Sequence, residues 1–159
     1  MSMIEQDDLL MSSPLMGKVI SLKEVDDSVF AQELLGKGVA IKPENGLLIA
    51  PFDGTVAMLF NTKHAIGLES ETGIELLIHI GIDTVNLEGR HFYPKVGSGE
   101  KFKKGDVLME FDIAEIQNEG YDTTTPIIVT NMDRFDVTII DEEAINKESN
   151  YIFYIQKKE

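Results

Sequence analysis

Short stretches of alternating apolar and polar residues, separated by Gly, Pro and Asp turns, recur along most of this chain. Successive side chains of a strand point to opposite faces, so these stretches predict strands that bury one face. The predicted strands are residues 17–22, 38–43, 47–50, 54–61, 64–68, 75–79, 92–95, 107–111, 127–129, 136–140 and 151–156. Their shortness and number indicate an all-β fold, an antiparallel β-sandwich or barrel-sandwich hybrid with one or two short helices.

Helical signals are confined to two places. Asp112 is a predicted N-cap with Glu115 three residues later as a capping box, and Gly120 ends that helix. A short helical turn is expected within residues 25–35. The length of 159 residues suits one domain with a sizeable core. We assign residues 1–12 to a flexible N-terminal tail and residues 13–159 to the domain.

Two of the three histidines lie in neighbouring predicted strands that a hairpin would join. Gly73 suits the positive φ of a short hairpin loop. With a loop centred on Glu71 and Thr72, His64 faces His79, and directly opposed residues have Cβ atoms about 5 Å apart. A slip of one residue stays open, because the sequence does not define the loop length. Two imidazoles this close can share one phosphoryl group or one metal ion.

The alternation also predicts which way the histidines point. One face of the second strand is apolar throughout and belongs in the core: Ile74, Leu76, Ile78 and Ile80. His79 therefore points away from the core, and His64 with it, among Phe60, Ile66 and Leu77. An exposed apolar surface with a polar centre is typical of a partner-binding site. The alternative is that both histidines are ordinary hydrogen-bonded strand residues.

Composition excludes several classes of function. The formal net charge of −14 argues against binding nucleic acid or an anionic membrane and favours a basic protein partner. The absence of cysteine excludes disulfides, thiolate metal sites and thiol catalysis. The first ten residues lack the pattern of a signal peptide, and no apolar run is long enough to insert into a membrane. We therefore expect a cytoplasmic protein.

Several short segments are distinctive when they are taken together. They are residues 29–31 (Val-Phe-Ala), 38–43 (Gly-Val-Ala-Ile-Lys-Pro), 63–65 (Lys-His-Ala), 78–85 (Ile-His-Ile-Gly-Ile-Asp-Thr-Val), 125–127 (Thr-Pro-Ile) and 131–133 (Asn-Met-Asp). They resemble the glucose-family IIA component of the bacterial phosphoenolpyruvate-dependent sugar phosphotransferase system. The resemblance runs from about residue 13 to 157, and members of that family are all-β barrel-sandwich proteins.

The resemblance implies a phosphotransferase that works as a phosphohistidine relay. The carrier protein HPr would deliver a phosphoryl group to Nε2 of His79, which would pass it to the IIB domain of a sugar permease. The Gly81 carbonyl would hold Nδ1 of His79. His64, helped by Thr62, would stabilise the phosphoryl oxygens. The sugar and the permease are not encoded in this chain.

The resemblance also implies the partner surface. Asp27 and Asp83 match carboxylates that meet basic groups of the partners. The apolar ring around the site matches Val29, Phe30, Phe60, Leu77 and Val85. No cofactor is required, although His64 and His79 could hold a zinc ion together with a carboxylate of a partner. The third histidine, His91, matches no ligand of the family and is expected to be structural.

Two other classes compete with the relay. His79 and Asp83 have the H-x-x-x-D spacing of zinc peptidases with a related β fold, but the accompanying H-x-H is missing. Residues 99–108 resemble a biotinyl or lipoyl carrier domain. Such carriers need a modifiable lysine at an exposed hairpin tip, and the predicted tip at residues 71–73 has none.

Overall fold

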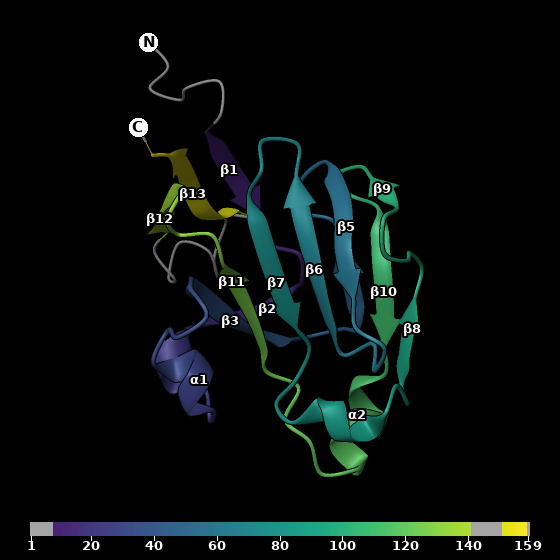
Figure 1. Cartoon of the computed structure of the whole chain (residues 1–159). Helices are drawn as coiled ribbons and strands as arrows, with labels where there is room; N and C mark the ends of the chain where they lie inside the picture. Colours follow the sequence, from purple (N-terminus) through teal and green to yellow (C-terminus); the bar gives the residue numbers. More distant parts are fainter. Residues whose placement is uncertain (1–7, 141–150, 159) are drawn as a thin grey trace.

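The computed structural model describes residues 8–140 and 151–158 (Figure 1). The strands are β1 (Leu9–Ser12), β2 (Gly17–Ser21), β3 (Lys37–Pro43), β4 (Leu47–Ile49), β5 (Gly54–Leu59), β6 (Ala65–Ser70), β7 (Glu75–His79), β8 (Phe92–Pro94), β9 (Lys101–Phe102), β10 (Val107–Phe111), β11 (Thr125–Val129), β12 (Phe135–Ile139) and β13 (Tyr151–Lys157). The helices are α1 (Ser28–Ala31) and α2 (Ile113–Asn118), with 3-10 turns η1 (Leu22–Glu24) and η2 (Thr84–Leu87).

The strands form three sheets in which the neighbouring strands run antiparallel. The largest has the order β2-β3-β11-β7-β6-β5-β9, and the two three-stranded sheets have the orders β1-β13-β12 and β4-β10-β8. Figure 1 shows β5, β6 and β7 side by side, with β8 and β10 beyond β5 and with β12 and β13 beyond β7. The predicted all-β class is confirmed. No helix in the described ranges is long and apolar enough to span a membrane.

The main core lies against the inward face of β6 and β7. Ile66 pairs with Ile78 and Leu68 pairs with Leu76, and these four side chains have at most 1% exposure. This is the alternation that the sequence predicts for β7. Because Leu76 and Ile78 point into the core, the alternate residues of β7, Leu77 and His79, face outward.

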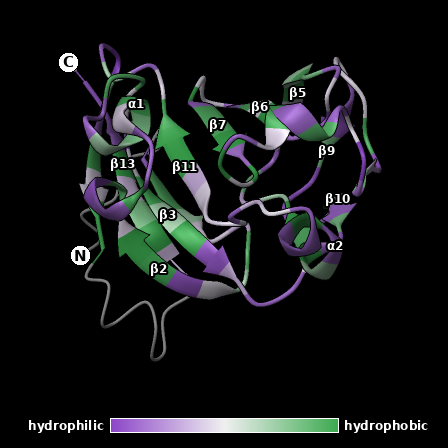
Figure 2. Ribbon diagram, turned by 90° about the horizontal axis from the view of Figure 1, so that it is seen from below, coloured by the Kyte–Doolittle hydropathy of each residue, from purple (hydrophilic) through white to green (hydrophobic). Residues whose placement is uncertain are grey.

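A second, smaller core covers part of the outward face. It joins α1 and η1 to β2, β3 and β11 and consists of Ile20, Leu22, Val25, Phe30, Ala40, Ile82 and Ile128. The N-cap of α1 is Asp27, whose carboxylate accepts a hydrogen bond from the amide of Val29 at 2.9 Å. Figure 2 shows α1 and α2 on opposite sides of the molecule. The helix α1 packs beside the end of β7, where the ring centroids of Phe30 and His79 are 5.0 Å apart.

Two strands were not expected from the sequence. Leu9–Ser12 is a strand paired with β13, and Met11 is fully buried, so the assignment of these residues to a flexible tail is wrong. The rest of the predicted tail, residues 1–7, lies outside the described residues. The short β9 is an edge strand that pairs with β5. Residues 9–12 therefore pack with the rest of the described chain.

The helix α2 begins where the sequence predicts. Its N-cap is Asp112, whose carboxylate accepts from the amide of Glu115 at 3.1 Å. The predicted reciprocal half of a capping box does not form, because the amide of Asp112 donates to the carbonyl of His91. The helical turn expected within residues 25–35 is α1.

Candidate functional site

The two histidines of the hairpin meet edge to face at the outward end of β6 and β7. Their ring centroids are 4.8 Å apart and their planes are inclined by 83°. The register is slipped by one residue from the arrangement centred on Glu71 and Thr72: Ala65 pairs with His79, and the carbonyl of His64 accepts from the amide of Ile80 at 2.7 Å. The contact predicted between the imidazoles is present, although the two residues are not directly opposed.

His64 reaches the outward face because it precedes β6. The turn before it is closed by a bond from the amide of Lys63 to the carbonyl of Phe60 at 2.8 Å. Lys63 has φ of +62°, a left-handed conformation that few residues other than glycine adopt. The turn at Lys63 interrupts the in-and-out alternation of side chains between His64 and the strand that follows. Ile66, which was predicted to share the outward surface with His64, therefore lies in the core with 0% exposure.

His79 is held by a backbone carbonyl. Its Nδ1 lies 2.8 Å from the oxygen of Gly81. A carbonyl oxygen only accepts hydrogen bonds, so Nδ1 must carry the proton. In the neutral imidazole this leaves the lone pair on Nε2.

His64 is held by a hydroxyl. Its Nδ1 lies 2.7 Å from Oγ1 of Thr62, and either atom could be the donor. If the hydroxyl donates, Nε2 of His64 carries the proton and becomes a donor. The side chain is buried, with 4% exposure, which corrects the prediction that both histidines are exposed. The rings of Phe60 and His79, with centroids 5.8 and 4.8 Å from that of His64, contribute to this burial.

Both imidazoles are held in the neutral form near pH 7. Burial, and then the neighbouring ring of His79, lower the pKa of His64 to about 4. Burial also lowers the pKa of His79. The bond to Gly81 and the charges of Asp27 and Asp83 act in the opposite direction on the pKa of His79. A neutral imidazole is the form that is nucleophilic.

The apolar residues that were predicted to surround the site divide into exposed and buried ones. Val29, Phe60 and Val85 are 40%, 37% and 47% exposed. Leu77 is half-buried and lies two residues before His79 on the same face of β7. Phe30 is buried instead, with its ring centroid 5.0 Å from that of His79. Phe30 therefore supports the imidazole rather than offering a free surface.

The two predicted carboxylates lie on the same side as His79 but differ in what they do. The carboxylate of Asp27 caps α1 by accepting from the amide of Val29. Asp83 is exposed, has φ of +60°, and its side chain makes no capping hydrogen bond to η2. Both charges are near enough to influence the pKa of His79.

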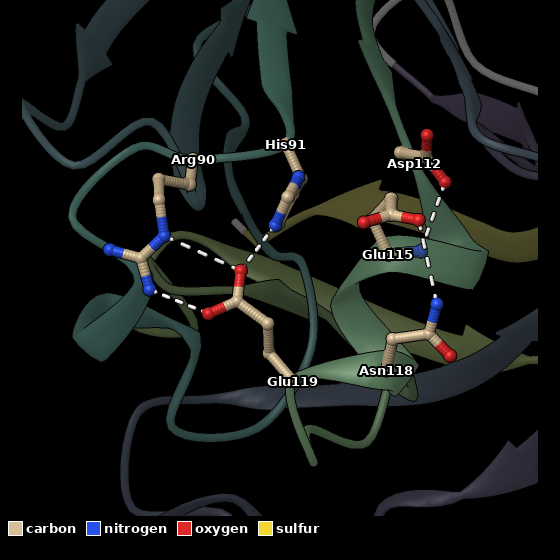
Figure 3. Close-up of polar contacts among 6 residues, drawn as sticks. All are labelled: Arg90, His91, Asp112, Glu115, Asn118 and Glu119. Atoms are coloured by element: carbon tan, nitrogen blue, oxygen red, sulfur yellow. Dashed lines mark hydrogen bonds and ion pairs between the residues drawn. The ribbon is translucent and has the colours of Figure 1, made fainter.

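His91 lies in a separate cluster. Its Nε2 contacts the carboxylate of Glu119, which also accepts from Arg90 at 2.7 Å (Figure 3). These bonds lower the pKa of Glu119 to about 2. The cluster ties the turn before β8 to the C-terminus of α2. His91 is structural, as predicted, although it is bonded to a carboxylate rather than simply solvated.

Sequence reasoning missed the support beneath the site. Thr84 is fully buried, and its hydroxyl donates to the carbonyl of Ile80 at 2.5 Å. The amide of Ile82 donates to the carbonyl of Asp122 at 2.9 Å. Thr84 lies in the distinctive segment 78–85, but nothing in the sequence indicated that its hydroxyl would bond the carbonyl four residues earlier.

His64 and His79 are the two side chains of the site whose rings are in contact, and both are potential metal ligands. Within residues 8–140 and 151–158, no group of three or more His, Cys, Asp or Glu side chains is placed to hold a metal ion. Two imidazoles fall short of the three or four protein ligands usual for zinc. Among the described residues, no third ligand accompanies the two imidazoles.

Comparison with known proteins shows the family. Residues 9–135 match the family described as phosphoenolpyruvate-dependent sugar phosphotransferase system, EIIA 1. The chain is 50% identical over 129 residues to a glucose-specific EIIA component from Oceanobacillus iheyensis, covering 81% of this chain and 78% of that protein. The chain therefore belongs to the EIIA 1 family of the phosphotransferase system, as its resemblance indicated.

Further relatives agree in fold and differ in length. Glucose permease IIA from Mycoplasma capricolum superimposes with a TM-score of 0.75 at 38% identity, covering 78% of this chain and 80% of that one. A beta-glucoside-specific EIIBCA component from Dickeya chrysanthemi is 53% identical over 128 residues, which are 80% of this chain and 20% of that protein. This chain thus spans about a fifth of the length of such multidomain relatives.

Proposed function

We propose that this domain carries a phosphoryl group on Nε2 of His79, accepting it from HPr and passing it to the IIB domain of a glucose-family sugar permease. The observation that carries the proposal is the 2.8 Å bond between Nδ1 of His79 and the carbonyl of Gly81. It holds the proton on Nδ1 and leaves the lone pair on Nε2, the nitrogen that we propose as the nucleophile. Membership of the EIIA 1 family supports the same assignment.

The transfer balances with the groups present. The lone pair on Nε2 of His79 attacks the phosphorus of the phosphohistidine of the donor. A new N–P bond forms while the N–P bond of the donor breaks, and its electron pair returns to the donor imidazole. The proton on Nδ1 stays in place, bonded to Gly81. In the second step a nucleophile of the acceptor attacks the phosphorus, and His79 leaves as the same neutral imidazole.

His64 has a different role in this proposal. Phosphoryl transfer depends mainly on positioning and on stabilising the charge of the equatorial oxygens. When Thr62 donates to Nδ1 of His64, Nε2 of His64 carries a proton that can be donated to a phosphoryl oxygen. The edge-to-face contact with His79 brings that donor beside the attacking ring.

The surroundings support docking of protein partners. Val29, Phe60 and Val85 are exposed beside the carboxylates of Asp27 and Asp83, and the chain has a net charge of −14. Basic partners with an apolar centre would be attracted to such a surface. The EIIBCA relative, whose name joins B, C and A parts, supports a IIB domain as one partner. We place the reaction in the cytoplasm.

No resident cofactor is needed for this chemistry. A zinc ion bound by His64 and His79 together with a carboxylate of a partner is compatible with the two imidazoles, and would compete with phosphorylation for Nε2 of His79. A zinc hydrolase is less well supported, because among the described residues no group of three or more potential ligands is placed to hold a metal ion. A biotinyl or lipoyl carrier is also less well supported, because residues 71–73 at the tip of the hairpin include no lysine.

The test is phosphorylation by phosphoenolpyruvate, enzyme I and HPr, followed by intact mass and phosphorus NMR. We expect one acid-labile phosphoryl group on Nε2 of His79, formed only when HPr is present. His79→Ala should abolish it, whereas the matched variant His91→Gln should be labelled like the wild type. Labelling that survives in His79→Ala would show that the acceptor is another residue.

His64→Gln separates the two imidazoles. An amide retains a donor, so loading from HPr should continue slowly while transfer to the IIB domain falls more strongly. Single-turnover rates for both steps, with His91→Gln again as the control, measure this. Wild-type rates in both steps would remove His64 from the mechanism.

A further inference from the structure

The peptide before Gly81 is held by a side chain that the relay does not otherwise use. Thr84 has 0% exposure, and its Oγ1 donates to the carbonyl of Ile80 at 2.5 Å. The amide of Ile80 is bonded too, because it donates to the carbonyl of His64 at 2.7 Å. Ile80, which lies between the two histidines in the hydrogen-bond network, is thus held through both its amide and its carbonyl.

The peptide after Gly81 is held from the other side. The carbonyl of Gly81, which accepts from His79, belongs to the same planar unit as the amide of Ile82. That amide donates to the carbonyl of Asp122 at 2.9 Å. The carboxylate of Asp122 accepts from the amide and the hydroxyl of Thr124 at 2.9 and 2.7 Å, which steadies the segment before β11.

Gly81 fits closely between these two supports. A Cβ atom at Gly81 would lie 2.5 Å from Cγ2 of Thr84 and 2.8 Å from the carbonyl oxygen of Asp122. Its φ of +81° is also one that glycine adopts most easily. The methyl group of Thr84 therefore packs against the turn while its hydroxyl bonds the turn, and the φ and ψ of Gly81 have little room to change.

We infer that Thr84 is a positioning residue that, through the carbonyl of Ile80, keeps the carbonyl of Gly81 aimed at Nδ1 of His79. This inference rests on the proposed function, since it matters for transfer only if His79 is the acceptor. Thr84 touches neither the imidazole nor a phosphoryl group in this scheme. It acts by holding one of the two peptides that define the conformation of Gly81.

The direction of that carbonyl determines which nitrogen can react. With the Gly81 oxygen in place, the proton stays on Nδ1 and Nε2 keeps its lone pair. If the turn relaxed, the Nε2–H tautomer would become populated, and in that form Nε2 has no lone pair for the phosphorus. Loss of the hydroxyl of Thr84 should therefore lower the nucleophilic fraction of His79 without changing the residue that reacts.

Thr84→Val and Thr84→Ser provide a matched pair. Valine keeps the shape and removes the hydroxyl, and serine keeps the hydroxyl and removes the methyl. Thr125→Val is the control, because Thr125 is equally buried and its hydroxyl donates to a carbonyl, that of Thr123, outside this turn. Two-bond proton–nitrogen NMR spectra of His79 report its tautomer, and phospho-HPr gives the rate of loading.

We expect Thr84→Val to show a measurable Nε2–H population at His79 and a loading rate lower by roughly tenfold. Thr84→Ser and Thr125→Val should keep the wild-type tautomer and stay within about twofold of its rate. The inference is overturned if Thr84→Val keeps the wild-type tautomer, or if Thr125→Val shifts it equally.

Two further outcomes keep the test decisive. If Thr84→Val does not fold, Thr84→Ala replaces it, because alanine also removes the hydroxyl. An Nε2–H population in Thr84→Ala that Thr84→Ser lacks supports the inference, and a wild-type tautomer in Thr84→Ala overturns it. If wild-type protein is not loaded by HPr, the proposed function fails. The tautomer measurement needs no phosphoryl donor, so it still tests the role of Thr84 separately.

Discussion

The two ends of the β6–β7 hairpin are built in opposite ways. At the closed end, side chains complete the hydrogen bonds of the backbone. Ser70 Oγ accepts from the amide of Ile74 at 2.9 Å. The amide group of Asn131 accepts from the backbone of Glu75 at 3.0 Å and donates to that of Gly73 at 2.8 Å.

At the open end, the backbone orients a side chain. The carbonyl of Gly81 determines the tautomer of His79, and the peptides around Gly81 are fixed by Thr84 and Asp122. Similar hydrogen bonds therefore complete the backbone at one end and orient an imidazole at the other. Substitutions at the closed end should therefore change the free energy of unfolding, whereas those at the open end should also change transfer.

The largest effect is expected at Gly81. Gly81→Ala places a methyl group against Thr84 and Asp122 at a φ of +81°, so unfolding free energy should fall by on the order of 3 kcal/mol and loading by on the order of 100-fold. Gly105→Ala is the control, with φ of +95° and nothing within 4 Å of a Cβ atom. It should cost only about 1 kcal/mol, and loading should stay normal.

Urea denaturation and single-turnover loading measure both quantities. Equal losses of stability in Gly81→Ala and Gly105→Ala would show that backbone conformation alone, and not the fit between Thr84 and Asp122, constrains the turn. Normal loading in a folded Gly81→Ala would show that the conformation of Gly81 does not control transfer.

The next effect is the dependence of stability on pH. The pKa of His64 is about 4 in the folded protein and about 6.5 when unfolded, so the unfolded state binds more protons between these values. Stability should therefore fall as pH decreases from 6.5 to 4, by about 3 kcal/mol in total from this group. The loss is absent above pH 6.5 and complete below pH 4.

Urea titrations at several pH values check this expectation. His64→Gln removes the titrating group, so the difference in stability between wild type and variant should itself vary with pH in that window. A difference that is constant from pH 4 to 7 would show that His64 is protonated as easily in the folded state as in the unfolded state.

A smaller effect is expected at the closed end. Asn131→Ala removes both bonds to the hairpin, so unfolding free energy should fall by about 2 kcal/mol. Loading should stay within about twofold of wild type, because the change lies away from Gly81 and His79. Asn131→Asp keeps an acceptor for the amide of Glu75 and loses the donor to Gly73, so its stability should be intermediate. A large loss of loading in either variant would contradict the expectation that the closed end affects stability alone.

The local pattern of apolar and polar residues was enough to predict the bounds of strands that are flanked by turn residues. The bounds of β7 and β10 agree with those expected, because alternation and flanking turn residues mark both ends. It was not enough for β1 and β9. The partner of β1 is β13, far away in the sequence, and β9 has only two residues, with lysines before and after its phenylalanine.

The site was predictable where it depends on residue type and not where it depends on turn geometry. The spacing of two between His79 and Gly81, and between Thr62 and His64, came from resemblance and is matched by real hydrogen bonds. The register and the burial of His64 depend on Lys63 with φ of +62°, which lysine does not signal. The carbonyl of Asp122 is a backbone group, and any residue could supply it.

The pairing of β1 with β13 has a consequence for folding. Leu9 pairs with Ile155, so the strand that is made early cannot dock until the strand that is made late has been synthesised. Met11 is fully buried in the folded protein, and its side chain stays exposed to solvent until β13 pairs with β1. Contacts between such distant segments slow folding. We expect the β6–β7 hairpin with its histidines to form earlier, and the closure of β1 onto β13 to be among the last events of folding.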